Sequence, residues 1–340
     1  MINFRYHLVS IAAAFLALAV GIVLGSTELQ GPTYDFLNNT TAALQSELDD
    51  VSGQLDTAQA QAAVGGAYAN VVEPVVLRDL LTGQRLMIIT EPGAPAFVVT
   101  AISNAVGYAG GTVTGQIALQ PKFFDTTGPA LGSLRQVNVA TAQTSHITLD
   151  SSKTYQQQAA HLLASECLTK SPGSPVVQQS GSQPAADAQS VLAAYAQSGF
   201  LTIGGQPATQ ATLAVIVTPQ NAPPDGSSDP LGQLLVPLAG ELAAKSAATV
   251  VAGSSSGSGP GSPIAVLRSS SMADQVSSVD DADLVVGQSV VIQALATRRD
   301  GGVLGSYGIT ANGATAVAPS PAPTPAASVR SASAGQGAKK

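Results

Sequence analysis

The stretch ATLAVIVTP at residues 211–219 is the most informative part of the chain for the fold. Every side chain from Leu213 to Val217 is apolar. A short, continuous apolar run is typical of a parallel strand with both faces buried. Parallel sheets are covered by helices on both faces, so this run predicts an α/β domain.

Short β-rich runs and helical stretches alternate on both sides of this strand. Further strands are predicted over RLMIIT (85–90), TVTGQIAL (112–119) and AATVVAG (247–253). Helices are predicted over 96–108, 155–168, 187–198, 232–246 and 286–297. The alternation predicts an α/β domain over residues 67–313, with a mainly parallel sheet covered by helices. The order is similar on both sides of residue 205, which leaves a weak internal duplication open.

Four low-complexity stretches interrupt or follow this domain. Residues 171–184, 219–230 and 253–263 are rich in Gly, Ser and Pro, and we expect surface loops too poor in apolar side chains to pack. Residues 314–340 repeat Pro among Ala and Ser, which predicts a disordered tail.

The N-terminal stretch LVSIAAAFLALAVGIVLG (8–25) contains 18 residues without a charge. As a helix it spans roughly 27 Å, enough for a thin bilayer core. A cleaved signal peptide is the first alternative, but its apolar run is shorter, and Leu24 is too large for the site before a cut after Ser26. A buried core helix is the second. We predict an uncleaved transmembrane helix, with Arg5 keeping the stub of residues 1–7 in the cytoplasm and the main domain outside it.

A polar, helical stretch follows the anchor over residues 28–63. Residues four and three apart form an apolar seam, at Leu37, Thr41, Leu44, Leu48, Val51, Leu55, Ala58 and Ala62. This spacing predicts a coiled-coil stalk and a homo-oligomer held through it. A single amphipathic helix packed on the following domain is the alternative. Gly65 and Gly66 are expected to end the helix in either case.

Composition disfavours several classes of protein. The net charge is −7 and no basic run exists, which disfavours nucleic acid as a partner. The absence of Trp and an aromatic content of 4% disfavour a transmembrane β-barrel, which needs aromatic girdles. A single cysteine excludes a disulfide framework and a multi-cysteine metal site.

No catalytic or cofactor motif is convincing. GSSSG at 253–257 fits the nucleophile elbow G-x-S-x-G around Ser255, but no histidine follows it in the sequence, as the α/β-hydrolase order requires. Neither a P-loop nor a G-x-G-x-x-G fingerprint occurs. We therefore expect neither an enzyme nor a resident cofactor.

Residues that could bind a metal are few. His146, His161 and Cys167 are weak candidates for binding Cu(I). His161 and Cys167 are six residues apart on a predicted helix, roughly 240° around its axis, so they do not share a face. A lone cysteine is more often a buried thiol than a ligand.

An acidic cluster of Asp280, Asp281 and Asp283, with Asp274 before it, lies near a predicted helix start. Carboxylates there cap free N–H groups and favour the helix dipole, which we prefer to a cation or partner site. Arg268 upstream and Arg298 and Arg299 downstream could be their ionic partners.

Two long motifs give the sequence a resemblance. The chain resembles the actinobacterial family named for mycobacterial copper transport protein B, MctB. The resemblance lies in INFRYHLVSIAAAFLALAVGIVLGS (2–26) and in VSSVDDADLVVGQSVVIQAL (276–295), which is followed by Gly-Ser-Tyr-Gly at 305–308. The resemblance spans roughly residues 2–310 and includes TVTGQIAL.

The resemblance implies an envelope protein that supports copper transport, efflux and homeostasis, described in mycobacteria as an outer-membrane channel. It supplies no copper-binding residues, so copper is expected as a transported ion only. Corynebacterial relatives imply an alternative, a non-enzymatic envelope scaffold for cell division or wall assembly with a membrane or cytoplasmic-side protein partner. The expected location is the cell membrane or envelope.

Overall fold

The computed structural model describes residues 4–171, 184–207, 209–222 and 230–309. The chain divides into two compact units, Met1–Gly65 and Gly66–Lys340. We describe each unit by itself. Most of the predicted loop at 171–184, part of that at 219–230 and the predicted tail lie outside the described residues.

The first helix, α1, runs without interruption from Phe4 to Val76. The expectation that Gly65 and Gly66 end it is wrong. A glycine ends a helix when it adopts a left-handed conformation, and neither glycine has a positive φ. Asn70 Nδ2 donates to the Gly66 carbonyl oxygen, 2.9 Å away, within the continuing helix. Each glycine costs the helix about 1 kcal/mol relative to alanine, a cost that its alanine-rich surroundings tolerate.

Residues Arg5–Gly25 of α1 form the one span among the described residues that is long and apolar enough to cross a membrane. None of it is buried within the fold, so the core-helix alternative is wrong. Further along α1, the stalk seam is also exposed: Leu37, Leu44, Leu48, Val51 and Leu55 expose 55–68% of their surface. A coiled coil stays a prediction.

A seven-stranded sheet forms the second unit, in the order β3-β2-β1-β4-β5-β6-β7. The strands are β1 (Arg85–Thr90), β2 (Thr112–Leu119), β3 (Leu201–Gly205), β4 (Leu213–Val217), β5 (Ala248–Ala252), β6 (Ser277–Val279) and β7 (Ser306–Tyr307). All neighbours are parallel except β3, which is antiparallel to β2. The predicted α/β class with a mainly parallel sheet is confirmed.

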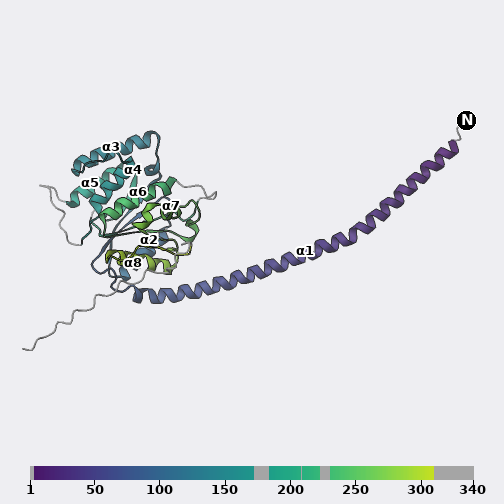
Figure 1. Ribbon diagram of the computed structural model, residues 1–340, viewed down its shortest axis with the longest axis horizontal. Helices are drawn as coiled ribbons and strands as arrows, with labels where there is room; N and C mark the ends of the chain where they lie inside the picture. The colour runs from purple at the N-terminus through teal and green to yellow at the C-terminus, as the bar shows by residue number, and fades with distance from the viewer. Residues whose placement is uncertain (1–3, 172–183, 208, 223–229, 310–340) are drawn as a thin grey trace, which may run out of the picture. The chain divides into compact units, whose positions relative to one another are not determined.

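Helices cover both faces of the sheet (Figure 1). Helices α2 (Ala96–Tyr108) and α8 (Val285–Arg299) pack on one face. The other face carries α3 (Gly128–Thr144), α4 (Tyr155–Cys167), α5 (Pro184–Gln197), α6 (Pro230–Lys245) and α7 (Pro263–Ser269). Short 3-10 turns lie at η1 (Pro121–Phe124), η2 (Ser255–Gly257) and η3 (Ser271–Asp274).

The central strand β4 supplies both apolar cores. Leu213, Val215 and Val217 join the cluster with α2 and α8, whereas Ala214 and Ile216 join the cluster on the opposite face. All five residues are completely buried. The alternation follows from strand geometry, because successive side chains point to opposite faces of a sheet.

Some elements were not expected from the sequence. Helix α3 buries Asn138 and Thr141 beside Leu134, so it lacks a continuous apolar stripe. Asn138 Nδ2 donates to the Tyr155 carbonyl oxygen at 2.7 Å, and its Oδ1 accepts from the Tyr195 hydroxyl at 2.7 Å. Polar side chains paired in this way can be buried without the pattern that reveals a helix.

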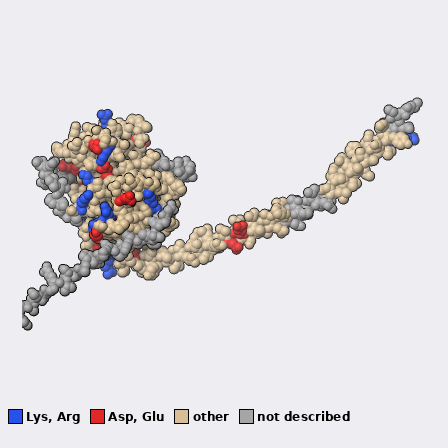
Figure 2. Space-filling view, in the orientation of Figure 1, with Lys and Arg blue, Asp and Glu red and all other residues tan. Residues whose placement is uncertain are grey.

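Charged side chains are sparse on the second unit. Figure 2 shows Lys and Arg interspersed with Asp and Glu on the visible face, without a basic patch. That face therefore offers no surface matched to a phosphate backbone.

The second unit also includes the last turns of α1, where Glu73 is buried at 8% exposure. Ser289 Oγ of α8 donates to Glu73 Oε1 at 3.2 Å. Burial raises the pKa of Glu73, and the hydrogen bond from Ser289 offsets part of that effect. Leu77 and Leu81 are buried just beyond, and Arg299 Nη1 donates to the Leu80 carbonyl oxygen at 2.8 Å.

Glu73→Gln is expected to stabilise the full-length protein at pH 7 but not at pH 4. The pKa of Glu73 is higher in the folded than in the unfolded protein. The free energy of unfolding therefore falls as pH rises from the unfolded-state pKa through the folded-state pKa. The glutamine keeps the shape and avoids the buried charge, so the melting temperature rises by roughly 1–3 °C at pH 7. Thermal unfolding at both pH values measures the difference. An equal shift at pH 4 and pH 7 would contradict a titration effect.

Candidate functional site

The carboxyl edge of the parallel sheet is where α/β proteins usually bind ligands. Strands β1 and β4 are neighbours, and the helices that follow them, α2 and α6, lie on opposite faces. This arrangement is a topological switch point, which opens a crevice beyond the strand ends in ligand-binding members of the class. The loops that follow β1, β4 and β5 lie at this edge.

Those loops are bonded to one another at this position. Gln220 N donates to the Gly93 carbonyl oxygen at 3.1 Å, which joins the loops after β1 and β4. Ser254 Oγ and Ser256 Oγ both donate to the Gln220 carbonyl oxygen, at 2.8 and 2.7 Å. A Cβ on Gly257 would lie 2.4 Å from the Pro219 carbonyl oxygen, so only glycine permits this approach. The chain's own loops thus occupy the switch point.

The expectation that residues 253–263 form a loop that does not pack is therefore wrong. Ser254, Ser258 and Ser262 are 0–6% exposed, and Gly253 and Gly257 are buried. Serine hydroxyls replace apolar contacts here, because each buried hydroxyl finds a backbone partner. Ser258 Oγ, for example, donates to the Ser254 carbonyl oxygen at 2.7 Å.

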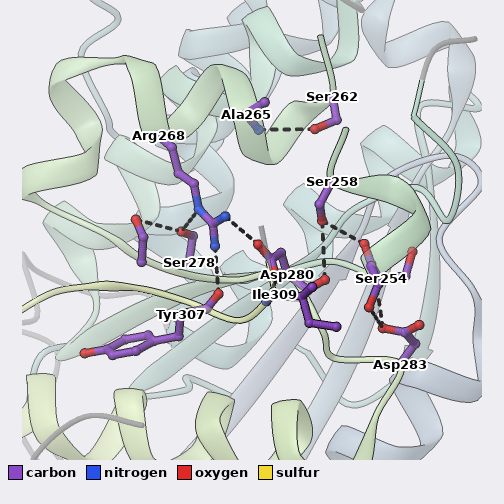
Figure 3. Close-up of polar contacts among 12 residues, drawn as sticks. Ser254, Ser258, Ser262, Ala265, Arg268, Ser278, Asp280, Asp283, Tyr307 and Ile309 are labelled. Atoms are coloured by element: carbon purple, nitrogen blue, oxygen red, sulfur yellow. Dashed lines mark hydrogen bonds and ion pairs between the residues drawn. The ribbon is translucent and has the colours of Figure 1, made fainter. Parts of the chain in front are cut away.

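A buried ion pair lies next to these serines (Figure 3). The Arg268 guanidinium of α7 donates to Asp280 Oδ2 at 2.5 Å, to Ser278 Oγ at 2.9 Å and to the Tyr307 carbonyl oxygen at 2.8 Å. The Asp280 side chain is fully buried, and that of Arg268 is 15% exposed. One guanidinium thereby ties α7 to both strands at the β7 edge of the sheet.

The chain that follows β7 encloses the same carboxylate. Ile309 N donates to Asp280 Oδ1 at 2.7 Å. Gly308 adopts a φ of 111°, and a Cβ there would lie 2.0 Å from Oδ1. Glycine is required at this position for both reasons. The Gly-Ser-Tyr-Gly motif at 305–308 therefore serves to close the chain around Asp280.

The acidic cluster does not cap α8, contrary to our preference. Leu284 occupies the N-cap, with no side-chain cap hydrogen bond. Asp283 Oδ1 instead accepts from Ser255 N at 3.0 Å and from Ser255 Oγ at 3.2 Å. Burial, and next the charge of Asp280, raise the pKa of Asp281. Asp274 lies in η3, away from the start of α8.

Of the arginines expected to pair with the acidic cluster, Arg268 does so. Arg268 pairs with Asp280, as proposed from the sequence. Arg299 pairs with its neighbour Asp300 instead, at 2.7 Å. Ser255, the centre of the GSSSG match, donates its hydroxyl to Asp283, an arrangement without an imidazole base.

The three candidate metal ligands lie in different surroundings. His146 lines an open hollow of about 490 Å³ beside the end of α3. His161 Nδ1 lies 2.8 Å from Glu241 Oε2 on α6. Cys167 is buried in the core at the end of α4. Among the residues that the structure describes, no three His, Cys, Asp or Glu side chains gather as a metal site.

The pair of His161 and Glu241 is also satisfied without a metal. Lys153 Nζ contacts Glu241 Oε1, so the carboxylate already has a cation beside it. Burial opposes ionisation of Glu241, but the hydrogen bonds from Lys153 and His161 outweigh it and lower the pKa of the carboxyl. The cluster links α4 and α6, and Glu241 as its centre was not found from the sequence.

Comparison with known proteins identifies the family. Residues 1–319 match the family described as "Copper transport outer membrane protein, MctB". The chain belongs to the MctB family. It is 31% identical over 323 residues to "Copper transporter MctB" of Mycobacterium tuberculosis and of Mycobacterium bovis, covering 93% of this chain and 99% of each relative. The protein of the same name from Mycobacterium leprae is 29% identical, with the same coverage.

Membership of the MctB family supports a role in copper transport and an association with a membrane. The resemblance seen in the sequence is thereby confirmed over almost the whole chain. The names of these relatives mention neither cell division nor wall assembly, so the scaffold alternative gains no support from them.

Asp280→Asn is expected to destabilise the folded protein by about 3–5 kcal/mol, because it leaves the buried Arg268 charge uncompensated. Chemical denaturation of the full-length protein measures the change. Asp300→Asn, in the exposed pair with Arg299, is the matched control and costs less than about 1 kcal/mol. Equal losses for the two variants would contradict a structural role of the buried pair.

Cys167 is expected to be unreactive in the native protein. Burial, and to a lesser extent the Glu166 charge, raise the pKa of its thiol to about 12. At pH 8 alkylation by iodoacetamide should be about a hundredfold slower than in the denatured chain. Because this is the only cysteine, mass spectrometry reports its modification directly. Rapid labelling of the folded protein would show that the core around α4 opens.

Proposed function

We propose that the protein is a membrane-anchored envelope component of copper efflux, with its N-terminus in the cytoplasm and its α/β domain outside. Family membership over residues 1–319 is the observation that carries the copper role. Arg5 before the apolar span, and Glu28 and Asp35 after it, support the orientation by the positive-inside tendency.

The proposed role does not require a catalytic site in the domain. Two of the three aspartates at the carboxyl edge are paired: Asp280 with Arg268, and Asp283 with Ser255. The third, Asp281, buries its Oδ1 without a hydrogen-bond partner among the described residues. Reactive groups need free access to substrate and a nearby acid or base, and these pairs provide neither. We therefore propose a non-enzymatic protein for which copper is cargo and not a resident cofactor.

Assembly is part of the proposal. A single apolar helix has all its backbone hydrogen bonds within itself and encloses no polar path through a bilayer. Copper movement through this protein therefore needs several copies or a separate channel. Arg5–Gly25 is the only span of this kind among the described residues, so we propose that the protein acts as an oligomer.

Deletion of the protein in its native host is expected to lower the copper concentration that stops growth and to raise cell-associated copper. The full-length chain should restore both, whereas a chain without residues 8–25 should not, because it lacks the proposed anchor. Growth curves and elemental analysis of washed cells provide the measurements. Zinc tolerance is the control and should not change. Unchanged copper content in the deletion strain would refute the copper role.

A further inference from the structure

The exposed seam of α1 has the features of a surface that binds its own copy. It comprises Leu37, Thr41, Leu44, Leu48, Val51, Leu55, Ala58 and Ala62, spaced alternately four and three residues apart. Its five large members expose 55–68% of their surface. Side chains at this spacing drift slowly around a straight helix, and they stay along one line of contact when two helices with the same repeat coil around each other.

We propose that α1 forms a parallel, in-register homodimer along this seam, with residues 37–62 as the interface. The proposal rests on the proposed function only for the membrane anchor and does not involve copper. Two copies anchored through Arg5–Gly25 in one membrane have their stalks leaving the bilayer in the same direction. The anchors therefore favour a parallel pair, and confinement to the membrane raises the effective concentration of the stalks.

Charge placement does not oppose a second copy as the occupant. Residues 36–65 contain four acidic side chains and no basic one, and Figure 2 shows acidic atoms gathered midway along α1. In a heptad with Leu48 and Leu55 at position a, Asp49, Asp50 and Asp56 fall at the outer positions b and c. Glu47 alone falls beside the seam, where a parallel partner presents Ser52.

The polar member of the seam does not oppose this pairing. Thr41 Oγ1 donates to the Leu37 carbonyl oxygen within the same helix, at 2.7 Å. Its hydroxyl is therefore satisfied, and the methyl group can contact the partner. Ala58 and Ala62 make the upper part of the seam narrow, so two helices approach closely there.

Cysteine cross-linking of the full-length protein in its membrane tests the proposal with two matched variants. Ala58→Cys places a thiol at a seam position d, whereas Ala60→Cys places the same thiol on the opposite side, at position f. Under mild oxidation with diamide, Ala58→Cys should give about tenfold more disulfide dimer than Ala60→Cys, because only seam thiols meet within bonding distance. The unaltered chain, whose Cys167 is buried, is the baseline.

A second pair of variants tests the seam without moving the thiol. Adding Leu48→Asp to Ala58→Cys should abolish the dimer, while adding Ser46→Asp, which lies outside the seam, should leave it intact. Equal cross-linking of Ala58→Cys and Ala60→Cys, or a monomer in both, would overturn the proposal. So would an adduct of Ala58→Cys with a chain of another mass, which would identify a different partner. If the disulfide dimer forms but deletion of the protein leaves copper tolerance unchanged, the dimer is supported and the copper role is refuted.

Discussion

The fold depends on burying β4 on both faces. All five of its side chains are completely buried, and they divide between two apolar clusters. A strand of this kind cannot face water on either side, so helices must cover both surfaces of the sheet. The α2 and α8 layer and the opposite layer, from α3 to α7, follow from that requirement.

The carboxyl edge shows how the same sheet differs from a ligand-binding one. In related architectures the switch point stays open and backbone N–H groups face a bound anion. Here Gln220 accepts hydrogen bonds from two serines, and Gly257 lies against Pro219. Backbone groups of Gly93 and Gln220 that could contact a ligand are hydrogen-bonded to the neighbouring loops instead. The described loops hold this edge together, and the buried pair of Arg268 and Asp280 extends these contacts to the last strand.

Sequence reasoning succeeded where a single local pattern determines the outcome. The strand 85–90 and the helix 96–108 have the predicted limits, since apolar runs and turn residues bound them directly. It failed for β6, whose sequence SSV has two buried serines, and for residues 253–263. These serines are buried because their hydroxyls bond to groups distant in the sequence: Ser254 donates to the Gln220 carbonyl oxygen, and Ser277 accepts from Gly305 N. Those partners are known only from the tertiary fold.

Only part of the candidate site could be predicted, because its other contacts join residues that are distant in the sequence. Arg268 and Asp280 could be paired from the sequence, yet Asp283 could not be assigned, because a carboxylate before a helix fits a cap equally well. Its partner is Ser255, on a loop 28 residues earlier. Similarly, the separate surroundings of His146, His161 and Cys167 depend on how α3, α4 and α6 pack. Side-chain inventory alone does not reveal such distances.

Because Arg268, Asp280 and Asp283 at the sheet edge are bonded within the fold, the proposed transport role depends on other parts of the chain as well. Copper moving across a bilayer needs polar or soft ligands along its path, whereas Leu8–Gly25 contains one serine and otherwise only apolar residues and glycine. A lone copy of that helix therefore gives a copper ion no continuous set of partners. Either several copies surround a path together, or the chain supports a path formed by another protein. In the proposed role both cases require a contact outside the folded domain, and the exposed seam of α1 is where we propose that contact.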